Sequence, residues 1–285
     1  MNNMQEKNSF GREIIINGTV FRMNKSIMHG SDSRIFVAHS LKDGGGPAFV
    51  IKCFRCFPGS DSWKKAMREI EAGKMLRNCP YIVHLKGSSI VKETEGNQYR
   101  IYLLFERLQC LDNLRNIGFR TCMELCRDIC LGLEFMRKKG LVHGDVKPQN
   151  IFFDGKKWML GDLGSVCVSG EVPEYGSEGY ISPEAFRGQP CDIRSDLYSL
   201  GITLYKTLSG GRLPFCTVPC EEADDNDVYC AIKRRLSGEE ISELPQVNRE
   251  INSLLLKLCR FDPHKRYKKP SAAAKDAQRL LSTAL

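Results

Sequence analysis

Short β-type runs separated by turns dominate the first part of the chain, and one helical pattern interrupts them. The helical pattern covers residues 61–76, with Ile70 and Leu76 among its apolar positions. The predicted strands are residues 13–17, 34–39, 47–52, 81–85 and 100–105. This part of the chain is therefore expected to form a small sheet that carries one helix.

After about residue 109 the pattern becomes mainly helical, with loops that contain glycine and proline. The predicted helices are residues 122–139, 193–209, 225–236, 248–259 and 271–281. We find no internal repeat or low-complexity tract. The patterns together predict an α+β fold with a tail at residues 1–12, a strand-rich lobe at 13–108 and a helix-rich lobe at 109–285.

Composition narrows the class of protein. A chain of 285 residues with 42% hydrophobic content can bury a substantial core. The net charge of +8 is spread among interspersed acids, so we expect a solvated surface and no nucleic-acid partner. No run reaches the roughly 18 apolar residues of a membrane span, and the polar start MNNMQEKNSF is unlike a secretory signal. These features favour a cytoplasmic protein.

Thirteen cysteines are an odd number in a chain well above the size that needs a disulfide framework, so free thiols are expected. Cys53 and Cys56 form a CxxC, but no second pair follows at zinc-site spacing, which favours coincidence over metal binding. Cys122, Cys126 and Cys130 recur every fourth residue beside apolar positions. They are expected on the buried face of one helix.

The stretch LVHGDVKPQN, residues 141–150, gathers an acid, a lysine and an amide in a loop that follows a helical pattern. The apolar pair Ile151 and Phe152 comes next, and the sequence Gly161-Asp-Leu-Gly164 follows soon after. Phosphoryl transfer from a nucleotide needs such groups, because carboxylate and amide oxygens hold Mg²⁺ while another carboxylate orients the attacking hydroxyl. Taken alone, each residue also has a structural explanation, as a turn former or a loop cap.

A cation for the phosphates is also required, and Lys52 at the end of a predicted strand is the candidate. Glu69 in the following helix is favoured as its partner because it lies seven residues before Leu76, on the same helical face. Glu71 is the competing acid and points elsewhere.

In this order the motifs resemble a eukaryotic-type (Hanks-type) serine/threonine protein kinase catalytic domain, over about residues 23–281. The resemblance implies a bilobal fold in which Lys52 contacts phosphate and Glu69 holds it. It implies that Asp145 is the catalytic-loop acid, that Lys147 contacts the transferred phosphate, and that Asn150 and Asp162 hold Mg²⁺, with Mn²⁺ as a trial metal.

The same resemblance implies a protein substrate with serine or threonine hydroxyls, because Lys147 follows Asp145 by two residues and Ser177 should lie near both. Glu184 and Arg266 should form a buried pair, and Asp196 should bond the catalytic-loop backbone. His143 is expected to be a core histidine rather than a base. The residues implied to bind ATP are Met28, Gly30, Ser33, Ile35, Val50, Lys52, Glu106, Leu108 and Phe152.

Three features of the sequence depart from the family pattern. The glycine-rich loop keeps only Gly30, so the phosphate lid should be weakened or reshaped. Asp162 stands in DLG rather than DFG. Gly144 replaces the arginine of HRD, which normally meets a phosphorylated residue, so an Arg-coupled phosphoswitch is not expected.

Two alternatives compete with an active protein kinase. The degraded glycine-rich loop motivates a pseudokinase or scaffold that binds nucleotide or partners without turnover, although retention of Lys52, Glu69, Asp145, Asn150 and Asp162 weighs against it. A small-molecule kinase is disfavoured by Ser182-Pro-Glu184 and by Arg266.

Overall fold

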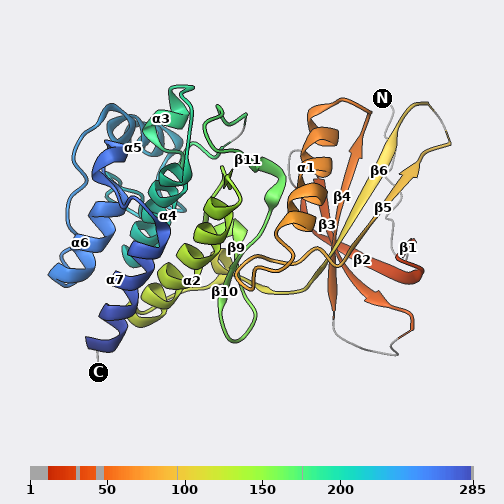
Figure 1. Cartoon of the computed structure of the whole chain (residues 1–285), viewed down its shortest axis with the longest axis horizontal. Coiled ribbons are helices and arrows are strands. Elements are labelled where there is room, and N and C mark those ends of the chain that lie inside the picture. Colours follow the sequence, from red (N-terminus) through yellow and green to blue (C-terminus); the bar gives the residue numbers. More distant parts are fainter. Residues whose placement is uncertain (1–11, 30–32, 43–47, 95, 175, 284–285) are drawn as a thin grey trace. The chain divides into compact units, whose positions relative to one another are not determined.

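The computed structural model describes residues 12–29, 33–42, 48–94, 96–174 and 176–283. The chain divides into two compact units, one of residues 1–77 and 84–108, the other of residues 78–83 and 109–285. Residues 78–83, which the sequence analysis put in the first lobe, thus group with the second unit. The α+β class is confirmed, with an antiparallel sheet in the first unit and mainly helices in the second (Figure 1).

The first unit contains a six-stranded antiparallel sheet in the order β1-β2-β3-β4-β6-β5. Its strands are β1 (Arg12–Ile16), β2 (Thr19–His29), β3 (Ser33–Ser40), β4 (Phe49–Cys56), β5 (Gly87–Lys92) and β6 (Tyr99–Glu106). Its helix is α1 (Asp61–Met75), and Ser60 caps it by accepting a hydrogen bond from the backbone N–H of Trp63.

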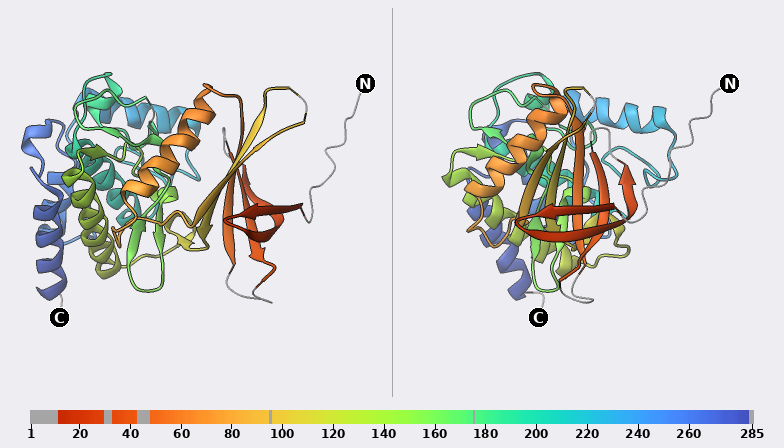
Figure 2. Two further views of the ribbon diagram at one scale, coloured as in Figure 1. Left: turned by 45° about the vertical axis from the view of Figure 1, so that its right-hand side comes forward. Right: turned by 90° about the vertical axis from the view of Figure 1, so that its right-hand side faces the viewer.

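Side chains alternate between the two faces of the sheet along each strand. In this sheet each face carries an apolar cluster. On one face Phe54, Ile101 and Leu103 pack with Ala66 and Ile70 of α1. The β1–β2 hairpin crosses the central strands on the other face (Figure 2). A second apolar cluster joins it to them, with the buried members Ile16, Phe21, Met23, Ala38, Ile51, Tyr102 and Leu104. The two clusters stabilise the strand register. In this register Lys52 of β4 lies on the same face as Phe54, the face that packs with α1.

The second unit is built mainly from helices. Its long helices are α2 (Phe119–Lys138), α4 (Ile193–Leu208), α5 (Asp225–Ser237), α6 (Arg249–Leu258) and α7 (Pro270–Thr283), and α3 (Pro183–Phe186) is one short turn. The helix α4 is almost entirely buried, and α2 packs against both α4 and α7. This helical core supports the loops that carry the polar side chains.

Short strands and 3₁₀ turns hold those loops. The strands are β7 (Gln109–Cys110), β8 (Leu141–Val142), β9 (Ile151–Phe153), β10 (Trp158–Leu160) and β11 (Cys167–Val168). The 3₁₀ turns are η1 (Leu111–Asn113), η2 (Pro148–Asn150), η3 (Leu163–Ser165) and η4 (Pro263–Lys265). β9 pairs with both β10 and β7 in a three-stranded sheet, and β8 pairs with β11 in a two-stranded one.

One predicted strand was wrong, two strands of the six-stranded sheet were missed, and the short strands β7 to β11 were not predicted. Residues 81–85 make only an isolated parallel bridge, between Ile82 and Leu160, because Ile82 and Val83 are buried as a connection rather than as part of a sheet. The long strand β2 was missed because polar residues interrupt its pattern and it contains register shifts near Ser26. β5 was missed because this edge strand begins with Gly-Ser-Ser and exposes its last three residues, so it lacks an alternating apolar pattern.

Two predictions about the cysteines are confirmed, that they are free thiols and that three of them lie on a buried helix face. All thirteen cysteines lie in the described part of the chain and are free thiols. Cys122, Cys126 and Cys130 are fully buried on α2, and burial raises the pKa of the Cys122 thiol. Within the described ranges, no group of three or more His, Cys, Asp or Glu side chains is placed to hold a metal ion, and no helix is long and apolar enough to cross a membrane.

Candidate active site

Lys52 and Glu69 form an ion pair in the first unit. The Nζ of Lys52 lies 2.9 Å from Oε2 of Glu69, and the two side chains are only 12% and 3% exposed. Glu71, the competing acid, is exposed. The preference for Glu69 is therefore matched by the contact, and its burial makes this pair electrostatically stronger than an exposed one.

The strand register surrounds Lys52 with apolar side chains. Ile35 of β3 is the cross-strand partner of Lys52, and Val50 precedes Lys52 by two residues, so all three share one face of the sheet. Ile35 and Val50 are half-buried. Met28 of β2 pairs with Ile35 through the backbone.

The remaining predicted ATP-binding residues of this unit have simple positions. Ser33 begins β3, Glu106 ends β6, and Leu108 follows it. The carboxylate of Glu106 lies 3.4 Å from Nζ of Lys86. The predicted contacts of Gly30 and of the Met28 side chain lie outside the described residues.

In the second unit, Asp196 of α4 holds the backbone of the loop after β8. Its Oδ2 accepts a hydrogen bond from the N–H of His143 at 2.7 Å, and its Oδ1 accepts one from the N–H of Gly144 at 2.9 Å. Burial raises the pKa of Asp196 to about 7, although these two amide donors lower it. The predicted structural role of Asp196 is confirmed by this geometry.

His143 is a buried core residue. Its Nδ1 accepts the N–H of Asp145 at 3.3 Å, so the ring proton lies on Nε2, which donates to the carbonyl of Gly161 at 3.0 Å. Burial lowers the pKa of His143, which keeps the ring neutral. Both ring nitrogens are thus used to fix the loop, as predicted.

Asp145 has two carboxylate oxygens in very different surroundings. Its Oδ2 lies 2.7 Å from Nζ of Lys147 and accepts a hydrogen bond from Nδ2 of Asn150 at 3.1 Å. Its Oδ1 is buried and has no hydrogen-bond partner in the described part of the chain. An unsatisfied buried acceptor costs stability, and the contacts of Oδ2 with Lys147 and Asn150 fix the orientation of the whole carboxylate.

Lys147 connects Asp145 to a distant segment. Besides its contact with Asp145, its Nζ donates a hydrogen bond to Oγ of Ser177 at 2.7 Å. The sequence separation of thirty residues between Lys147 and Ser177 is closed by the fold. Ser177, Lys147 and Asp145 therefore form one continuous cluster.

Asn150 and Asp162 are brought together through the backbone. The N–H of Gly161 donates to the carbonyl of Asn150 at 2.8 Å, directly beyond the β9–β10 pair, and Phe152 lies in β9. Asp162 has a left-handed backbone with φ of 57°, which is uncommon for a residue other than glycine. Its Oδ1 accepts the N–H of Gly164 at 3.4 Å. Such conformations cluster at functional sites.

The donor set of Asn150 and Asp162 fits a magnesium ion. The Nδ2 of Asn150 is used on the carbonyl and carboxylate of Asp145, which turns its Oδ1 away from them. An amide oxygen and a carboxylate are the hard oxygen ligands that Mg²⁺ prefers, with water and phosphate oxygens completing its shell.

The segment after Asp162 ends in a buried ion pair. Arg266 donates from both terminal nitrogens to the carboxylate of Glu184, at 2.6 and 2.8 Å, and Ser195 donates to it at 2.8 Å. Burial by itself would raise the pKa of Glu184, but the hydrogen bonds and charge of Arg266 hold that pKa below its ordinary value. The predicted Glu184–Arg266 pair is present.

Gly144 lies where a larger residue would clash. Its φ is +80°, and a Cβ atom on it would lie 2.7 Å from the carbonyl oxygen of Ser165 in η3. Only glycine accommodates both this conformation and this approach. The loop after β8 and the turn after Asp162 are therefore in close backbone contact.

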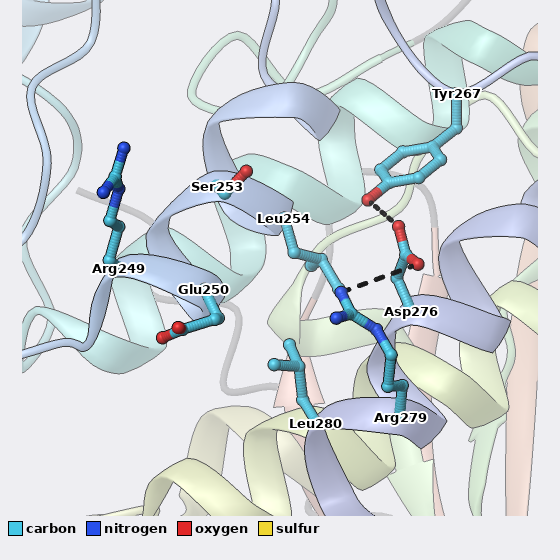
Figure 3. A pocket seen from close by; sticks show the side chains of 8 residues that line it. All are labelled: Arg249, Glu250, Ser253, Leu254, Tyr267, Asp276, Arg279 and Leu280. Carbon is cyan, nitrogen blue, oxygen red and sulfur yellow. Dashed lines mark hydrogen bonds and ion pairs between the residues drawn. The ribbon is translucent and has the colours of Figure 1, made fainter. Parts of the chain in front are cut away.

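A hollow of about 310 Å³ lies between α6 and α7 (Figure 3). Its lining includes Arg249, Tyr267, Asp276 and Arg279, and the hydroxyl of Tyr267 donates to Asp276 at 2.7 Å. None of the predicted site residues lines it.

Sequence reasoning missed Arg235, which is buried on α5 and contacts the segment after Ser177. A signal was present, because Arg235 lies four residues after the buried Ala231 and next to the buried Leu236. It therefore occupies the apolar face of the helix, where an arginine is rare.

Comparisons with known proteins agree with this geometry. A family model described as "Protein kinase domain" matches residues 21–278. The chain is 28% identical, over 70% of its length, to the probable serine/threonine-protein kinase PknB of Bifidobacterium longum, and 29% identical, over 70%, to the serine/threonine-protein kinase GIN4 of Saccharomyces cerevisiae. It is 38% identical over 33% of its length to the serine/threonine-protein kinase PknB of Mycolicibacterium smegmatis. The matches cover 31%, 18% and 16% of these relatives, so the chain spans about a third of their length or less.

Proposed function

The chain belongs to the protein kinase family and carries a Hanks-type serine/threonine kinase domain; from that premise we propose that it transfers the γ-phosphate of ATP to serine or threonine hydroxyls of proteins. The observation that carries the proposal is the state of Asp145. Its carboxylate is held by Lys147 and Asn150, and Lys147 also donates a hydrogen bond to Ser177. A carboxylate oriented in this way can accept the proton of an incoming hydroxyl.

Each side chain of the cluster has a stated role in this proposal. Asp145 orients the acceptor hydroxyl and takes its proton. Lys147 places a positive charge beside that hydroxyl and neutralises the phosphate as it is transferred. Lys52, held by Glu69, contacts the phosphates of ATP. Because phosphoryl transfer needs positioning and charge stabilisation more than covalent help, this set of groups suffices.

Asn150 and Asp162 would hold Mg²⁺, which supplies charge neutralisation on the phosphate oxygens when it is bound. The hydrogen bonds of Asn150 to Asp145 couple the position of this ligand to that of the proposed base. The residues proposed to bind ATP are those named from the sequence: Met28, Gly30, Ser33, Ile35, Val50, Glu106, Leu108 and Phe152.

The hydrogen bond between Lys147 and Ser177 supports the choice of serine or threonine as acceptor. Because Lys147 also contacts Asp145, this bond ties the segment that begins at Ser177 to the proposed base. Phosphoamino acid analysis of a labelled protein acceptor tests this choice. Phosphoserine or phosphothreonine is expected, and recovery of phosphotyrosine alone would refute the proposed acceptor class.

Regulation is proposed to proceed without an arginine in the HRD position. Gly144 offers no side chain for a phosphorylated residue, and its backbone is packed on Ser165 instead. The segment after Asp162 is held by the pairing of β11 with β8. It is also held by two backbone hydrogen bonds, from the N–H of Gly170 to the carbonyl of Cys191 and from the N–H of Cys191 to the carbonyl of Glu171. Backbone contacts therefore support the path of this segment.

A further inference from the structure

Arg235 is a buried cation that the proposed chemistry does not use. Its side chain comes from the last turn of α5, and the residue is 2% exposed. No carboxylate of the described residues lies within ion-pair distance of its guanidinium. Burying a charge without a countercharge is costly unless other groups replace its hydration, so its contacts require an explanation.

The contacts of Arg235 all go to the segment after Ser177 and to the helix beneath it. One terminal nitrogen donates to the carbonyl of Ile181 at 2.8 Å and to the hydroxyl of Tyr198 at 3.1 Å. The other donates to the carbonyl of Glu178 at 2.8 Å. The planar guanidinium thus bridges two carbonyl groups three residues apart, a geometry that suits its fork of donors.

The bridged carbonyls belong to a turn that begins at Ser177. The carbonyl of Ser177 accepts hydrogen bonds from the N–H groups of Tyr180 and Ile181, at 2.8 and 2.9 Å. Arg235 takes the carbonyls that this turn leaves over, those of Glu178 and Ile181. The path of the chain from Ser177 to Ile181 is therefore fixed at both ends by hydrogen bonds.

Tyr198 of α4 links this contact to the end of the same segment. The guanidinium of Arg235 lies 5.4 Å from the centre of the Tyr198 ring, and that of Arg266 lies 4.7 Å from it. Arg266 holds Glu184. One buried ring thus contacts both cations that anchor residues 178–184, and its electron-rich face offsets part of the cost of burying Arg235.

We propose that Arg235 is a positioning residue for the protein acceptor: it sets the backbone path of residues 178–181, and thereby the surface on which the chain flanking the acceptor hydroxyl binds beside Ser177. The inference rests on the proposed kinase function and goes beyond it, since Arg235 contacts neither Asp145 nor Lys147. Its loss is expected to weaken binding of the protein acceptor while leaving the handling of ATP intact.

Arg235→Ala and Arg235→Lys test the proposal, with Arg234→Ala as the matched control. Arg234 precedes Arg235 on α5, but it is exposed and pairs with Glu239. Each purified variant is assayed for phosphate transfer to a histone acceptor and for hydrolysis of ATP in the absence of acceptor. Hydrolysis serves as the internal measure of a folded ATP site.

The expected result for Arg235→Ala is an increase of about tenfold in KM for the acceptor, the equivalent of one lost charged hydrogen bond. The KM for ATP and the rate of ATP hydrolysis should change less than about twofold, within the usual effect of a substitution remote from bound ATP. Arg235→Lys should recover part of the loss, because an ammonium group reaches one carbonyl but cannot bridge two. Arg234→Ala should match the unaltered protein.

Hydrogen exchange supplies a readout that does not depend on activity. Amides of residues 178–184 should exchange faster in Arg235→Ala, while those of α2 and α4 keep their protection. An unchanged acceptor KM in Arg235→Ala would overturn this inference but would leave the proposed function standing. A parallel fall in ATP hydrolysis and transfer would also overturn it, by making Arg235 a general stabilising residue. Absence of transfer by the unaltered protein would instead refute the proposed function and, with it, this inference.

Discussion

Asn150 donates a hydrogen bond from Nδ2 to Oδ2 of Asp145 at 3.1 Å, and Oδ1 of the same carboxylate is left buried and unpartnered. One residue thus fixes the orientation of the other without consuming its second oxygen. The carboxylate of Asp145 is thereby held in one orientation beside Lys147, which also bonds Ser177.

Asp145→Asn should abolish most phosphate transfer. The amide has the same shape, so the hydrogen bond network of the loop is largely kept, but it cannot accept a proton. We expect a fall of about 10³-fold in kcat, typical for loss of a general base. Steady-state kinetics would check the rate, and the thermal unfolding midpoint should stay close to that of the unaltered protein. Retention of more than about a tenth of the activity would contradict the proposed role.

Glu69→Gln and Glu71→Gln form a matched pair of variants on α1. Glu69 is buried against Lys52, whereas Glu71 is exposed two residues away. We expect Glu69→Gln to reduce kcat/KM for ATP by about tenfold or more, since a buried charged contact contributes roughly 1.5–3 kcal/mol. Glu71→Gln should have little effect. Equal losses in the two variants would show that the ion pair does not position Lys52.

The Glu184–Arg266 pair should make the free energy of unfolding depend on pH in the acidic range. Because the folded state lowers the pKa of Glu184 below its ordinary value of 4.5, the carboxylate adds stability above that pH. This contribution is lost as pH falls through 4.5 toward the lower folded-state pKa. Glu184→Gln should cost about 3 kcal/mol at pH 7, because it leaves Arg266 buried without its countercharge.

Urea unfolding from pH 7 down to pH 3 would measure this effect. The difference in unfolding free energy between Glu184→Gln and the unaltered protein should shrink as the carboxylate of the latter becomes protonated. A difference that stays constant over the whole range would mean that the charge of Glu184 contributes nothing to stability.

Phosphatase treatment should leave the rate of phosphate transfer unchanged, because Gly144 supplies no arginine to bind a phosphorylated residue. The matched variant is Gly144→Arg. The Cβ of the new side chain would approach the carbonyl oxygen of Ser165, and the backbone φ at position 144 is strained for any residue other than glycine. The free energy of unfolding of this variant should therefore fall by about 1–3 kcal/mol. Loss of activity after phosphatase treatment of the unaltered protein would refute the absence of a phosphoswitch.

The sequence predicted best what depends on local pattern. The helices over 61–76, 193–209 and 225–236 differ from α1, α4 and α5 by at most one residue at either end, because apolar spacing and caps such as Ser60 and Asp224 are local signals. The cluster in residues 145–150 was also predicted from the sequence, since its groups lie within six positions of one another. Lys52 was identified as the candidate cation because it ends a predicted strand.

Irregular strands and non-local contacts were predicted less well. Polar residues interrupt β2, β5 begins with Gly-Ser-Ser, and the apolar run at 81–85 makes only one bridge, to Leu160 of β10. The bridge from Arg235 to Glu178 and Ile181 joins positions 54 and 57 residues apart. Only the placement of an arginine on the buried face of α5 pointed to it.

Phosphate transfer from radiolabelled ATP with Mg²⁺ tests the central proposal most directly. The acceptors are a basic protein and the chain itself, and Asp145→Ala and Asp162→Ala are the controls. The account predicts label on serine or threonine that disappears in both variants, because one removes the proposed base and the other a metal ligand. Label no greater than in these variants, even at high ATP concentration and with Mn²⁺, would contradict an active kinase and favour a domain that binds without turnover.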